Sequence, residues 1–509
     1  MDKVILDGHT LSLENIGRVA HDLDVEVSLD AQAIERMTAS RDFIEELVLS
    51  GETVYGVTTG FGRLADVTIA PEDRTDLQHN LVRSHASGMG AALDRESVRA
   101  LMLLRANALA RGHSGCRVMV VERLLALLNA GIHPMVPEFG SVGASGDLAP
   151  LAHVALGMLG EGTAECGGEE GPIAEFMARA GIDPVSLGSK EGLALINGTQ
   201  ATTGIGILAL LTAERAVETA EVAGAMSLEA LLGTPEAFRE EIHNARPHAG
   251  QIKSAARLRF LLRGSEIRES HRDGDPRVQD AYSLRCMPQV HGAARQALGY
   301  IRGILEVEAN STTDNPLVFP SAGVVVSGGN FHAQIVSQAL DLLVIAVTDM
   351  AAISERRIER LLNPDLSMGL PAFLTNRPGL ESGFMIAQVT AVDLLSELRI
   401  LSHPASVDSV PTSANQEDHV SMGMAAARKA RRSSKCLERV LATELMCAAQ
   451  GIEHRRPLKA GVGVESAHAA VRASVPRLDG DRVLGPDLEA LTELIRSGDL
   501  AQIGMESDT

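Results

Sequence analysis

Residues 333–362 read AQIVSQALDLLVIAVTDMAAISERRIERLL. The first part of this run carries charges only at Asp341 and Asp349, and a charged cluster begins at Glu355. Asn363-Pro364 follows, and a helix usually ends before a proline because the residue preceding it is pushed out of the helical conformation. Helices of this length usually pack against one another in a bundle. The stretch therefore predicts a mainly α fold that is built on a bundle of long helices.

Three other stretches have apolar residues at helical spacing, namely 117–130, 384–401 and 422–449. The first is followed by Gly131 and Pro134, which are typical of a helix end.

Short strand-like pieces occur near 3–6 and 323–327. The character of the sequence changes near 215–225, where long helices are expected to begin. We therefore expect a smaller N-terminal α+β domain, residues 1–220, which includes the glycine-rich segment 140–150, and a C-terminal long-helix bundle domain, residues 221–509.

Charge and cysteine content restrict the class of protein. The formal net charge of -20 repels nucleic acid and anionic membranes. The five cysteines are far apart and odd in number, which argues against a disulfide framework or a zinc site and suits the reducing cytoplasm. The first residues do not resemble a signal peptide, and the longest uncharged stretch, 192–213, is too polar to span a bilayer.

Glycine and proline cluster in five segments, which we expect to be loops on a rigid scaffold. These segments are 131–150, 160–172, 273–276, 314–323 and 363–383.

The loop with the most unusual chemistry is 140–150, which reads GSVGASGDLAP. Gly146 has no Cβ that would keep its amide nitrogen from the carbonyl carbon of Ala144. Closing that ring with loss of two water molecules would leave a methylidene-imidazolone. Its exocyclic alkene, which comes from the Ser145 side chain, is an electrophile that no standard side chain provides.

Two other interpretations of this segment remain open. Ser145 or Asp147 could cap a helix, with Pro150 in the first turn. A nucleophile elbow is disfavoured, because it requires glycine at the second position after the serine, where Asp147 stands.

The wider sequence favours the ring. The string GASGDLAPLAH, residues 143–153, resembles the signature of the aromatic amino-acid ammonia-lyase and aminomutase family, whose prosthetic group is this methylidene-imidazolone. Further motifs resemble the family in its order, namely YGVTTGFG (55–62), KEGLALINGT (190–199), YSLR (282–285), TDNP (313–316), GNFH (329–332) and NQE (415–417). The resemblance implies a homotetramer in which each site takes residues from more than one subunit.

Elimination of ammonia from an amino acid requires an electrophile that activates the amine and a base that removes a β-proton. The resemblance assigns the electrophile to the ring from Ala144, Ser145 and Gly146, and the base to Tyr55. It makes Tyr282 a second tyrosine near the electrophile. Outside its motif, Tyr55 would be read as a half-buried loop tyrosine.

The remaining assignments concern the substrate. Arg285 resembles the clamp for its carboxylate, because a guanidinium can donate two parallel hydrogen bonds. Asn197 and Gln279 resemble supporting polar contacts, and Phe331 resembles a wall of the aromatic pocket. The competing interpretations are a surface ion pair for Arg285 and core packing for Phe331.

Two positions in the family distinguish histidine from carbocyclic substrates. Ser84-His85 resembles histidine enzymes, although some tyrosine aminomutases share it. Glu417 can accept a hydrogen bond from an imidazole N–H, which a phenyl ring does not offer. Seen alone, His85 could be a structural histidine, and Glu417 a solvated or helix-capping carboxylate.

We therefore expect elimination of ammonia from L-histidine to give urocanate. The alternatives are a tyrosine or phenylalanine lyase or 2,3-aminomutase of the same family, and a catalytically silent helical scaffold in which the ring does not form. Ala281, Met287, His291 and Gln334 depart from the pattern of bacterial histidine enzymes and bear on this choice. No nucleotide loop or metal-binding spacing occurs in the sequence.

Overall fold

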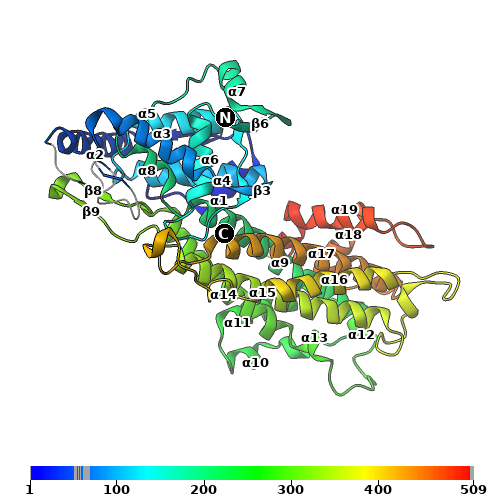
Figure 1. Cartoon of the computed structure of the whole chain (residues 1–509). Helices are drawn as coiled ribbons and strands as arrows, with labels where there is room; N and C mark the ends of the chain where they lie inside the picture. Colours follow the sequence, from blue (N-terminus) through cyan, green and yellow to red (C-terminus); the bar gives the residue numbers. More distant parts are fainter. Residues whose placement is uncertain (1, 51–53, 55–56, 58, 61–68, 505–509) are drawn as a thin grey trace. The chain divides into compact units, whose positions relative to one another are not determined.

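The structure is a computed structural model that describes residues 2–50, 54, 57, 59–60 and 69–504. Within these residues the chain forms twenty α-helices and nine short strands, so the predicted mainly α class is confirmed. Two compact units are present, and each is described separately (Figure 1).

Unit 1 consists of residues 1–208, 302–341 and 404–428, and unit 2 consists of residues 209–301, 342–403 and 429–509. Compactness does not by itself define independently folding domains, so the division at residues 220 and 221 stays a prediction.

Unit 1 contains most of the short elements. They are β1 (Lys3–Leu6), α1 (Leu13–His21), β2 (Glu26–Leu29), α2 (Ala31–Ser50), α3 (Arg74–His85), β3 (Met89–Ala92), α4 (Arg95–Ala110), α5 (Val118–Asn129), β4 (His133–Pro134), β5 (Pro137–Phe139), α6 (Leu148–Met158), β6 (Thr163–Cys166), β7 (Glu169–Pro172), α7 (Ile173–Ala180), α8 (Glu191–Ile196), β8 (Leu317–Phe319) and β9 (Val324–Val326).

Helix α4 is the centre of unit 1. The Asp94 carboxylate accepts a hydrogen bond from Ser97 N at 3.0 Å and caps the helix, which is then buried at every residue from Ser97 to Ala110. It packs against α1 and α5. Because no face of α4 is solvated, its arginines Arg99 and Arg105 must find hydrogen-bond acceptors inside the protein.

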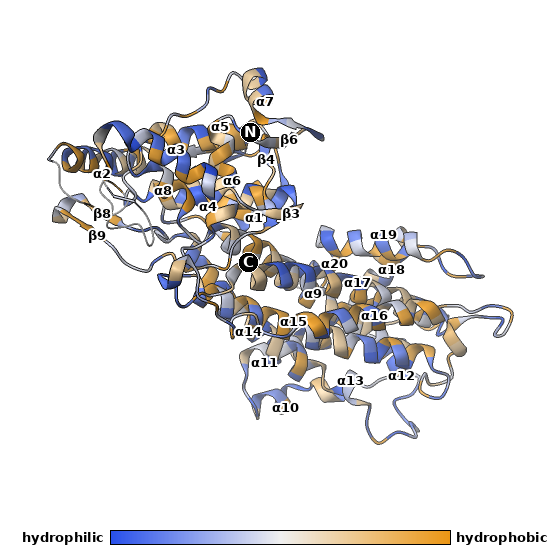
Figure 2. Ribbon diagram, viewed as in Figure 1, coloured by the Kyte–Doolittle hydropathy of each residue, from blue (hydrophilic) through white to orange (hydrophobic). Residues whose placement is uncertain are grey.

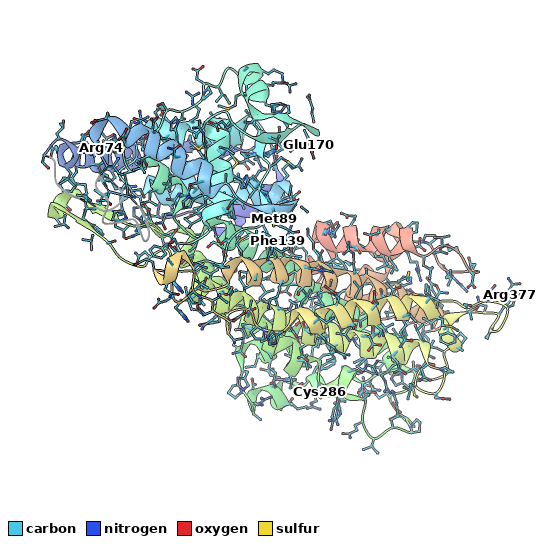
Figure 3. The ribbon with its side chains drawn as sticks, viewed as in Figure 1. Arg74, Met89, Phe139, Glu170, Cys286 and Arg377 are labelled. Atoms are coloured by element: carbon cyan, nitrogen blue, oxygen red, sulfur yellow. The ribbon has the colours of Figure 1, made fainter. Side chains whose placement is uncertain are left out.

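Two features of the strands lead to the site. Strands β3 and β5 pair antiparallel, with Met89 opposite Phe139, and the chain runs from β5 directly into the loop that begins at Gly140 (Figure 3). The prediction of a loop over 160–172 is wrong, because β6 and β7 form a hairpin there. Gly167 and Gly168 both have positive φ, as a tight two-residue turn requires, and their presence hid the flanking strands.

Four long helices contribute residues to both units, and the remaining helices belong to unit 2. The four are α9 (Gln200–Ala230), α14 (Met287–Ala309), α15 (Gln334–Leu362) and α17 (Gly423–Glu453). The others are α10 (Glu240–Asn244), α11 (Ala249–Leu261), α12 (Glu266–Glu269), α13 (Tyr282–Arg285), α16 (Met385–Leu401), α18 (Val462–Ser474), α19 (Gly485–Ser497) and α20 (Asp499–Gln502).

The predicted helices over 117–130, 333–362, 384–401 and 422–449 are confirmed as α5, α15, α16 and α17. Helix α9 begins at Gln200, earlier than the predicted 215–225. Its first turns are rich in threonine and glycine, which are poor helix formers, so the sequence pattern did not indicate this part of the helix. Apolar residues run along α15 and α16 (Figure 2). In the described part of the chain, only α15 is long and apolar enough to cross a membrane, and 56% of its most apolar window is buried.

Candidate active site

The loop after β5 lies with its last glycine against the turn between α8 and α9. Gly146 has φ +74° and forms a parallel bridge with Gly198, and Asp147 N donates to Gly198 O at 2.7 Å. A Cβ on Gly146 would lie 2.2 Å from Gly198 O, so no other residue fits there. Glycine is therefore required at 146 by the backbone of Gly198, a neighbour that the sequence could not show. The approach of the Gly146 nitrogen to the Ala144 carbonyl carbon stays a prediction.

The Asp147 side chain bears on the helix-cap interpretation. Helix α6 begins at the next residue and has Pro150 in its first turn, as the cap interpretation requires. The Asp147 carboxylate, however, makes no capping hydrogen bond and accepts instead from Thr202 N, Thr202 Oγ1 and Ser141 Oγ at 2.7, 2.8 and 3.0 Å. Burial raises the pKa of Asp147 to about 6 despite these donors. Its side chain thus anchors the loop to α9.

A cavity of about 460 Å³ opens beside this loop in unit 1. It is lined by Ala144, Ser145, Asn197, Asn315, Ser327, Gly328, Phe331, His332, Gln416, Glu417, Asp418 and His419. Five of the site residues predicted from sequence are therefore brought together, namely Ala144, Ser145, Asn197, Phe331 and Glu417. Gly146 follows them directly in the chain.

Glu417 is bound directly to the predicted electrophile position. Ser145 Oγ donates to Glu417 Oε1 at 2.7 Å, and Thr412 Oγ1 donates to Glu417 Oε2 at 2.7 Å. The backbones of Thr412 and Glu417 also pair in both directions. Since both carboxylate oxygens accept from hydroxyls, one of them that of Ser145 in the cavity wall, Glu417 is neither a solvated nor a helix-capping carboxylate.

The turn before Glu417 is strained. Ser413, Ala414 and Asn415 all have φ between 48° and 65°, a region that costs residues other than glycine roughly 1–2 kcal/mol each. The pairing of Thr412 with Glu417 offsets part of this cost. Strain of this kind is concentrated at functional sites in proteins, where the surroundings hold it in place.

The side-chain amide of Asn197 has a hydrogen-bond partner at its nitrogen and none at its oxygen among the described residues. Asn197 is 3% exposed at the end of α8, and its Nδ2 donates to Asn315 O at 3.3 Å. Its Oδ1 is buried and has no partner among the described residues. A buried acceptor without a donor is rare in folded proteins. Here the residue belongs to the wall shared with Ala144 and Ser145, where a bound group with an N–H or O–H could donate to Oδ1.

His85 lies at the end of α3 and does not line the cavity. Its Nδ1 donates to Leu81 O at 2.9 Å, which places the proton on Nδ1 and makes Nε2 the basic nitrogen. Burial lowers the pKa of His85, and the charge of Glu417 acts in the opposite direction. His85 therefore lies within the electrostatic reach of the cavity.

The sequence analysis did not single out Asn315, which holds part of the cavity wall. Its Oδ1 accepts from Ser327 Oγ at 3.1 Å and Gly328 N at 2.7 Å, and its backbone N donates to Asp314 Oδ1 at 2.7 Å. Asp314 in turn pairs at 2.9 Å with Lys190, and both side chains are fully buried. The signal was present, since Asn315 is part of the TDNP motif.

His332 and His419 also line the cavity and were not singled out. Their rings stack, with centroids 5.9 Å apart and planes 3° from parallel. His332 Nε2 donates to His419 O at 3.1 Å. Membership of His332 in the GNFH motif could have indicated this position.

Three predicted residues, Gln279, Tyr282 and Arg285, belong to unit 2 and do not line this cavity. Gln279 is exposed, and Tyr282 is 70% exposed. The Arg285 guanidinium lies 4.5 Å from the centre of the Tyr282 ring, and its Nε donates to Asp280 O at 2.9 Å. The predicted base Tyr55 lies outside the described residues.

The segment of Tyr282 and Arg285 is anchored by the buried side chain of Arg357. Arg357 Nη1 donates to Ser283 O at 3.3 Å, and Arg357 forms a fully buried ion pair with Glu444. Ser227 Oγ and Ser354 Oγ donate to the two Glu444 oxygens at 2.7 and 2.6 Å. The segment therefore presents Tyr282 from a rigid base.

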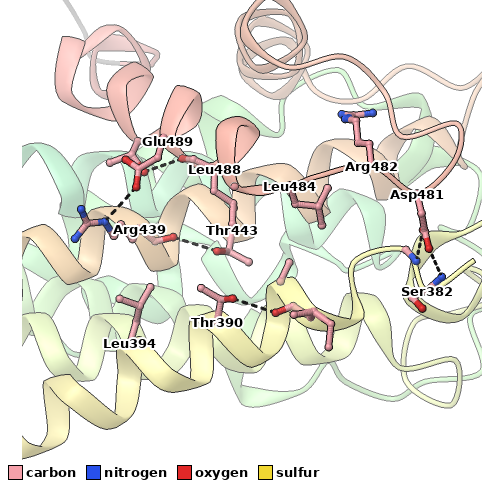
Figure 4. Close-up of a pocket in the computed structure, with 15 residues that line it drawn as sticks. Ser382, Thr390, Leu394, Arg439, Thr443, Asp481, Arg482, Leu484, Leu488 and Glu489 are labelled. Atoms are coloured by element: carbon pink, nitrogen blue, oxygen red, sulfur yellow. Dashed lines mark hydrogen bonds and ion pairs between the residues drawn. The ribbon is translucent and has the colours of Figure 1, made fainter.

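A larger cavity of about 550 Å³ lies in unit 2 among α16, α17 and α19 (Figure 4). Its hydroxyls are used within their own helices, since Thr390 donates to Ile386 O and Thr443 to Arg439 O, both at 3.1 Å. The Asp481 carboxylate accepts from two backbone amides. It contains no residue of the sequence motifs, so residue chemistry assigns the active site to the smaller cavity of unit 1.

In the described ranges, no cluster of three or more His, Cys, Asp or Glu side chains could hold a metal ion.

Comparisons with known proteins show the family of this chain. The family model for aromatic amino acid lyases matches residues 11–473. The histidine ammonia-lyase of Anaeromyxobacter dehalogenans is 53% identical over 98% of this chain and 100% of its own length.

Two solved structures are similar over nearly the whole chain. A histidine ammonia-lyase from Trypanosoma cruzi superimposes with a TM-score of 0.92 at 44% identity, covering 99% of this chain and 95% of that one. A tyrosine aminomutase from Streptomyces globisporus gives 0.93 at 39% identity, covering 100% and 99%. This chain belongs to the aromatic amino acid lyase family.

Proposed function

We propose that this enzyme eliminates ammonia from L-histidine to give urocanate, with a methylidene-imidazolone formed from Ala144, Ser145 and Gly146. The observation that carries the proposal is the hydrogen bond of 2.7 Å between Ser145 and Glu417 in the wall of the cavity. It joins the residue that would become the electrophile to the residue that would select an imidazole.

The residues around the loop fit the prosthetic group. Ala144 and Ser145 line the cavity, and Gly146 has the positive φ that a sharply bent backbone needs. When formed, the ring supplies the electrophile that turns the amine into a leaving group. The unpaired Oδ1 of Asn197 supplies an acceptor for the substrate ammonium beside it.

The other side chains bind and orient the substrate. Glu417 accepts the imidazole N–H, and Phe331 covers the ring face. Tyr55 is proposed to take the β-proton, with Tyr282 as a second tyrosine near the electrophile. His85 and Gln279 are proposed to provide further polar contacts, with the His85 proton held on Nδ1.

Histidine is the proposed substrate because a carboxylate at 417 has a hydrogen-bonding partner on imidazole and none on a phenyl ring. The similarity to relatives named histidine ammonia-lyase supports the same choice. A tyrosine aminomutase activity is the second candidate, since Ser84-His85 occurs in both kinds of enzyme and the Streptomyces globisporus enzyme has a closely similar fold.

We propose a homotetramer in which another subunit supplies Arg285 to clamp the substrate carboxylate. Arg285 pairs with no carboxylate among the described residues, and Tyr282 beside it is largely exposed. Helix α16 also exposes Ile386, Val389 and Ile400 at 62%, 57% and 70%, an apolar surface of the kind that association buries.

The free state of all five cysteines suits the proposed cytoplasmic location. Only small amino-acid substrates are proposed to bind, with no role for nucleic acid or membrane.

Two measurements test the function. The intact mass of the purified chain is expected to lie two water molecules below the sequence value, which would establish the ring. Incubation with histidine, tyrosine or phenylalanine is expected to show urocanate absorbance with histidine alone. Turnover of tyrosine without urocanate formation from histidine would overturn the histidine assignment and leave the ring intact.

A further inference from the structure

Arg105 is a buried arginine in the middle of α4, 1% exposed. Its Nη1 donates to Asn197 O at 3.0 Å, to Gln200 Oε1 at 2.9 Å and to Thr313 O at 3.3 Å. Its Nη2 donates to Ala194 O. All four acceptors are uncharged, so the guanidinium gathers carbonyl groups from α8, the following turn and the TDNP segment around one planar cation.

The acceptors surround the glycine against which the ring-forming loop lies. A Cβ on Gly198 would lie 2.4 Å from Arg105 Nη1, and a Cβ on Gly146 would lie 2.2 Å from Gly198 O. Gly198 therefore has Gly146 packed against its backbone and the Arg105 guanidinium close to its Cα, together with Gln200 Oε1 and Thr313 O. The position of the Gly198 backbone, and with it the surface behind Gly146, follows from the position of the guanidinium.

The same cation also fixes Asn197. Arg105 holds the Asn197 carbonyl, while the Asn197 side chain reaches the cavity wall with its unpaired Oδ1. Gln200 Nε2 donates to Thr313 Oγ1 at 2.6 Å, so Gln200 and Thr313 form a second connection between the same two segments. A shift of the guanidinium would therefore move both the support of the loop and the acceptor beside it.

We propose that Arg105 is a positioning residue for formation of the prosthetic ring and for placing Asn197. It holds Asn197 and Gly198 against the segment Ala144–Gly146, and it touches neither the substrate nor the ring. The inference rests on the proposed function.

The chain offers a matched control on the same helix. Arg99 is fully buried on α4 and also donates to backbone carbonyls, at Val19 O (2.7 Å), Leu128 O (3.0 Å) and Asp22 O (3.3 Å). None of these acceptors belongs to the cavity or to the ring-forming loop. Replacing either arginine by lysine keeps a positive charge and removes the planar fork, so the two variants share the general cost of disturbing α4.

The experiment compares full-length Arg105→Lys and Arg99→Lys with the wild type by thermal unfolding, intact mass, kcat and KM. We expect similar losses of thermal stability in both variants. Only Arg105→Lys is expected to show a smaller fraction of chains that have lost two water molecules. Per ring-containing chain, its kcat should fall about tenfold, as expected for a lost charged hydrogen bond, with KM changed less than about threefold.

Equal ring content and equal kcat in Arg105→Lys and Arg99→Lys would overturn the proposal. If Arg105→Lys does not yield folded protein, Gln200→Met replaces it, because this change removes one acceptor of Arg105 and the connection to Thr313. Wild-type ring content and kcat in Gln200→Met would then overturn the role of Arg105. A wild-type chain at its full mass would instead overturn the proposed prosthetic group, so the two failures are distinguishable.

Discussion

The cavity of unit 1 and the α13 segment of unit 2 carry motifs of the same family but differ in how complete they are. In the cavity, Glu417 is held by two hydroxyls, and Asn197 is 3% exposed. In α13, Tyr282 is 70% exposed, and the Arg285 guanidinium lies over the Tyr282 ring and donates to the Asp280 carbonyl. The difference teaches that motifs which serve one reaction need not meet inside one compact unit.

The two regions are alike in how they are supported. A buried ion pair lies under each, Lys190 with Asp314 in unit 1 and Arg357 with Glu444 in unit 2. Removing one partner of a buried pair is strongly destabilising, so each pair fixes the backbone that it touches. Both regions thus rest on a buried ion pair, but only the first forms the wall of a cavity.

The largest expected effect is on the cavity side. Ser145→Ala keeps the Cβ but removes the hydroxyl whose loss as water would form the alkene, so the rate should fall at least about a thousandfold. Thermal unfolding should be little changed, and the mass should equal that of the unmodified variant. Substantial residual lyase activity would refute the role of Ser145.

Co-expression of two impaired variants tests whether the two regions serve the same site. Ser145→Ala lacks the electrophile, and Arg285→Ala lacks the carboxylate clamp, which is expected to lower kcat/KM by about a hundredfold. If another subunit supplies Arg285, co-expressed chains will form some sites with both groups and regain activity. Activity no higher than the sum of the two separate variants would place both groups of each site in a single chain.

A smaller effect is expected for the specificity residue. Glu417→Gln keeps the shape and removes the charge, so kcat/KM for histidine should fall about 10- to 100-fold, the range of one charged hydrogen bond. Thr412→Val is the companion variant, because it removes only the hydroxyl that holds Glu417 Oε2. A Glu417→Gln enzyme with unchanged preference for histidine would contradict the assignment.

A further prediction concerns stability and its pH dependence and involves no change in activity. The pKa of Asp147 is raised from 3.8 to about 6, mainly by burial. Below about pH 4 both folded and unfolded chains hold the proton, so the shift has no effect there. Between about pH 4 and 6 the unfolded chain ionises first, so stability falls, and above about pH 6 the loss is constant at about 3 kcal/mol.

Asp147→Asn should flatten this part of the stability curve, measured by denaturant unfolding at several pH values. The level of stability is not the readout, because the asparagine amide would face donors from Ser141 and Thr202. Glu308, whose pKa is raised by burial and by Asp147, should contribute a remaining slope. An unchanged slope would show that Asp147 does not titrate in this range.

The sequence was sufficient for elements with a strong local signal. The apolar periodicity of 333–362 and the strand at 3–6 depend on neighbouring residues only, and both were predicted within a residue or two. The hairpin over 163–172 was missed, because its two glycines look like a loop although their positive φ is what a tight turn uses.

Site residues that belong to a sequence motif could be predicted. Contacts between residues that are far apart in the chain could not. Ala144, Ser145, Asn197, Phe331 and Glu417 meet in one cavity as their motifs suggested. The sequence could not show that segments 302–341 and 404–428 join unit 1, or that Arg105 backs the loop through Gly198. Such contacts join residues far apart in the chain and leave no local pattern.

The hydrogen bond between Ser145 and Glu417 makes the chain before ring formation differ from the chain after it in more than the electrophile. Under the proposed chemistry, the Ser145 hydroxyl departs as water, and Glu417 Oε1 loses its donor at that moment. In a chain without the ring, the Ser145 hydroxyl thus occupies the acceptor that would bind the imidazole. Ring formation frees this acceptor and forms the electrophile in the same reaction. A chain that has not matured would be both unreactive and poorly receptive to histidine, so idle copies would not sequester the substrate.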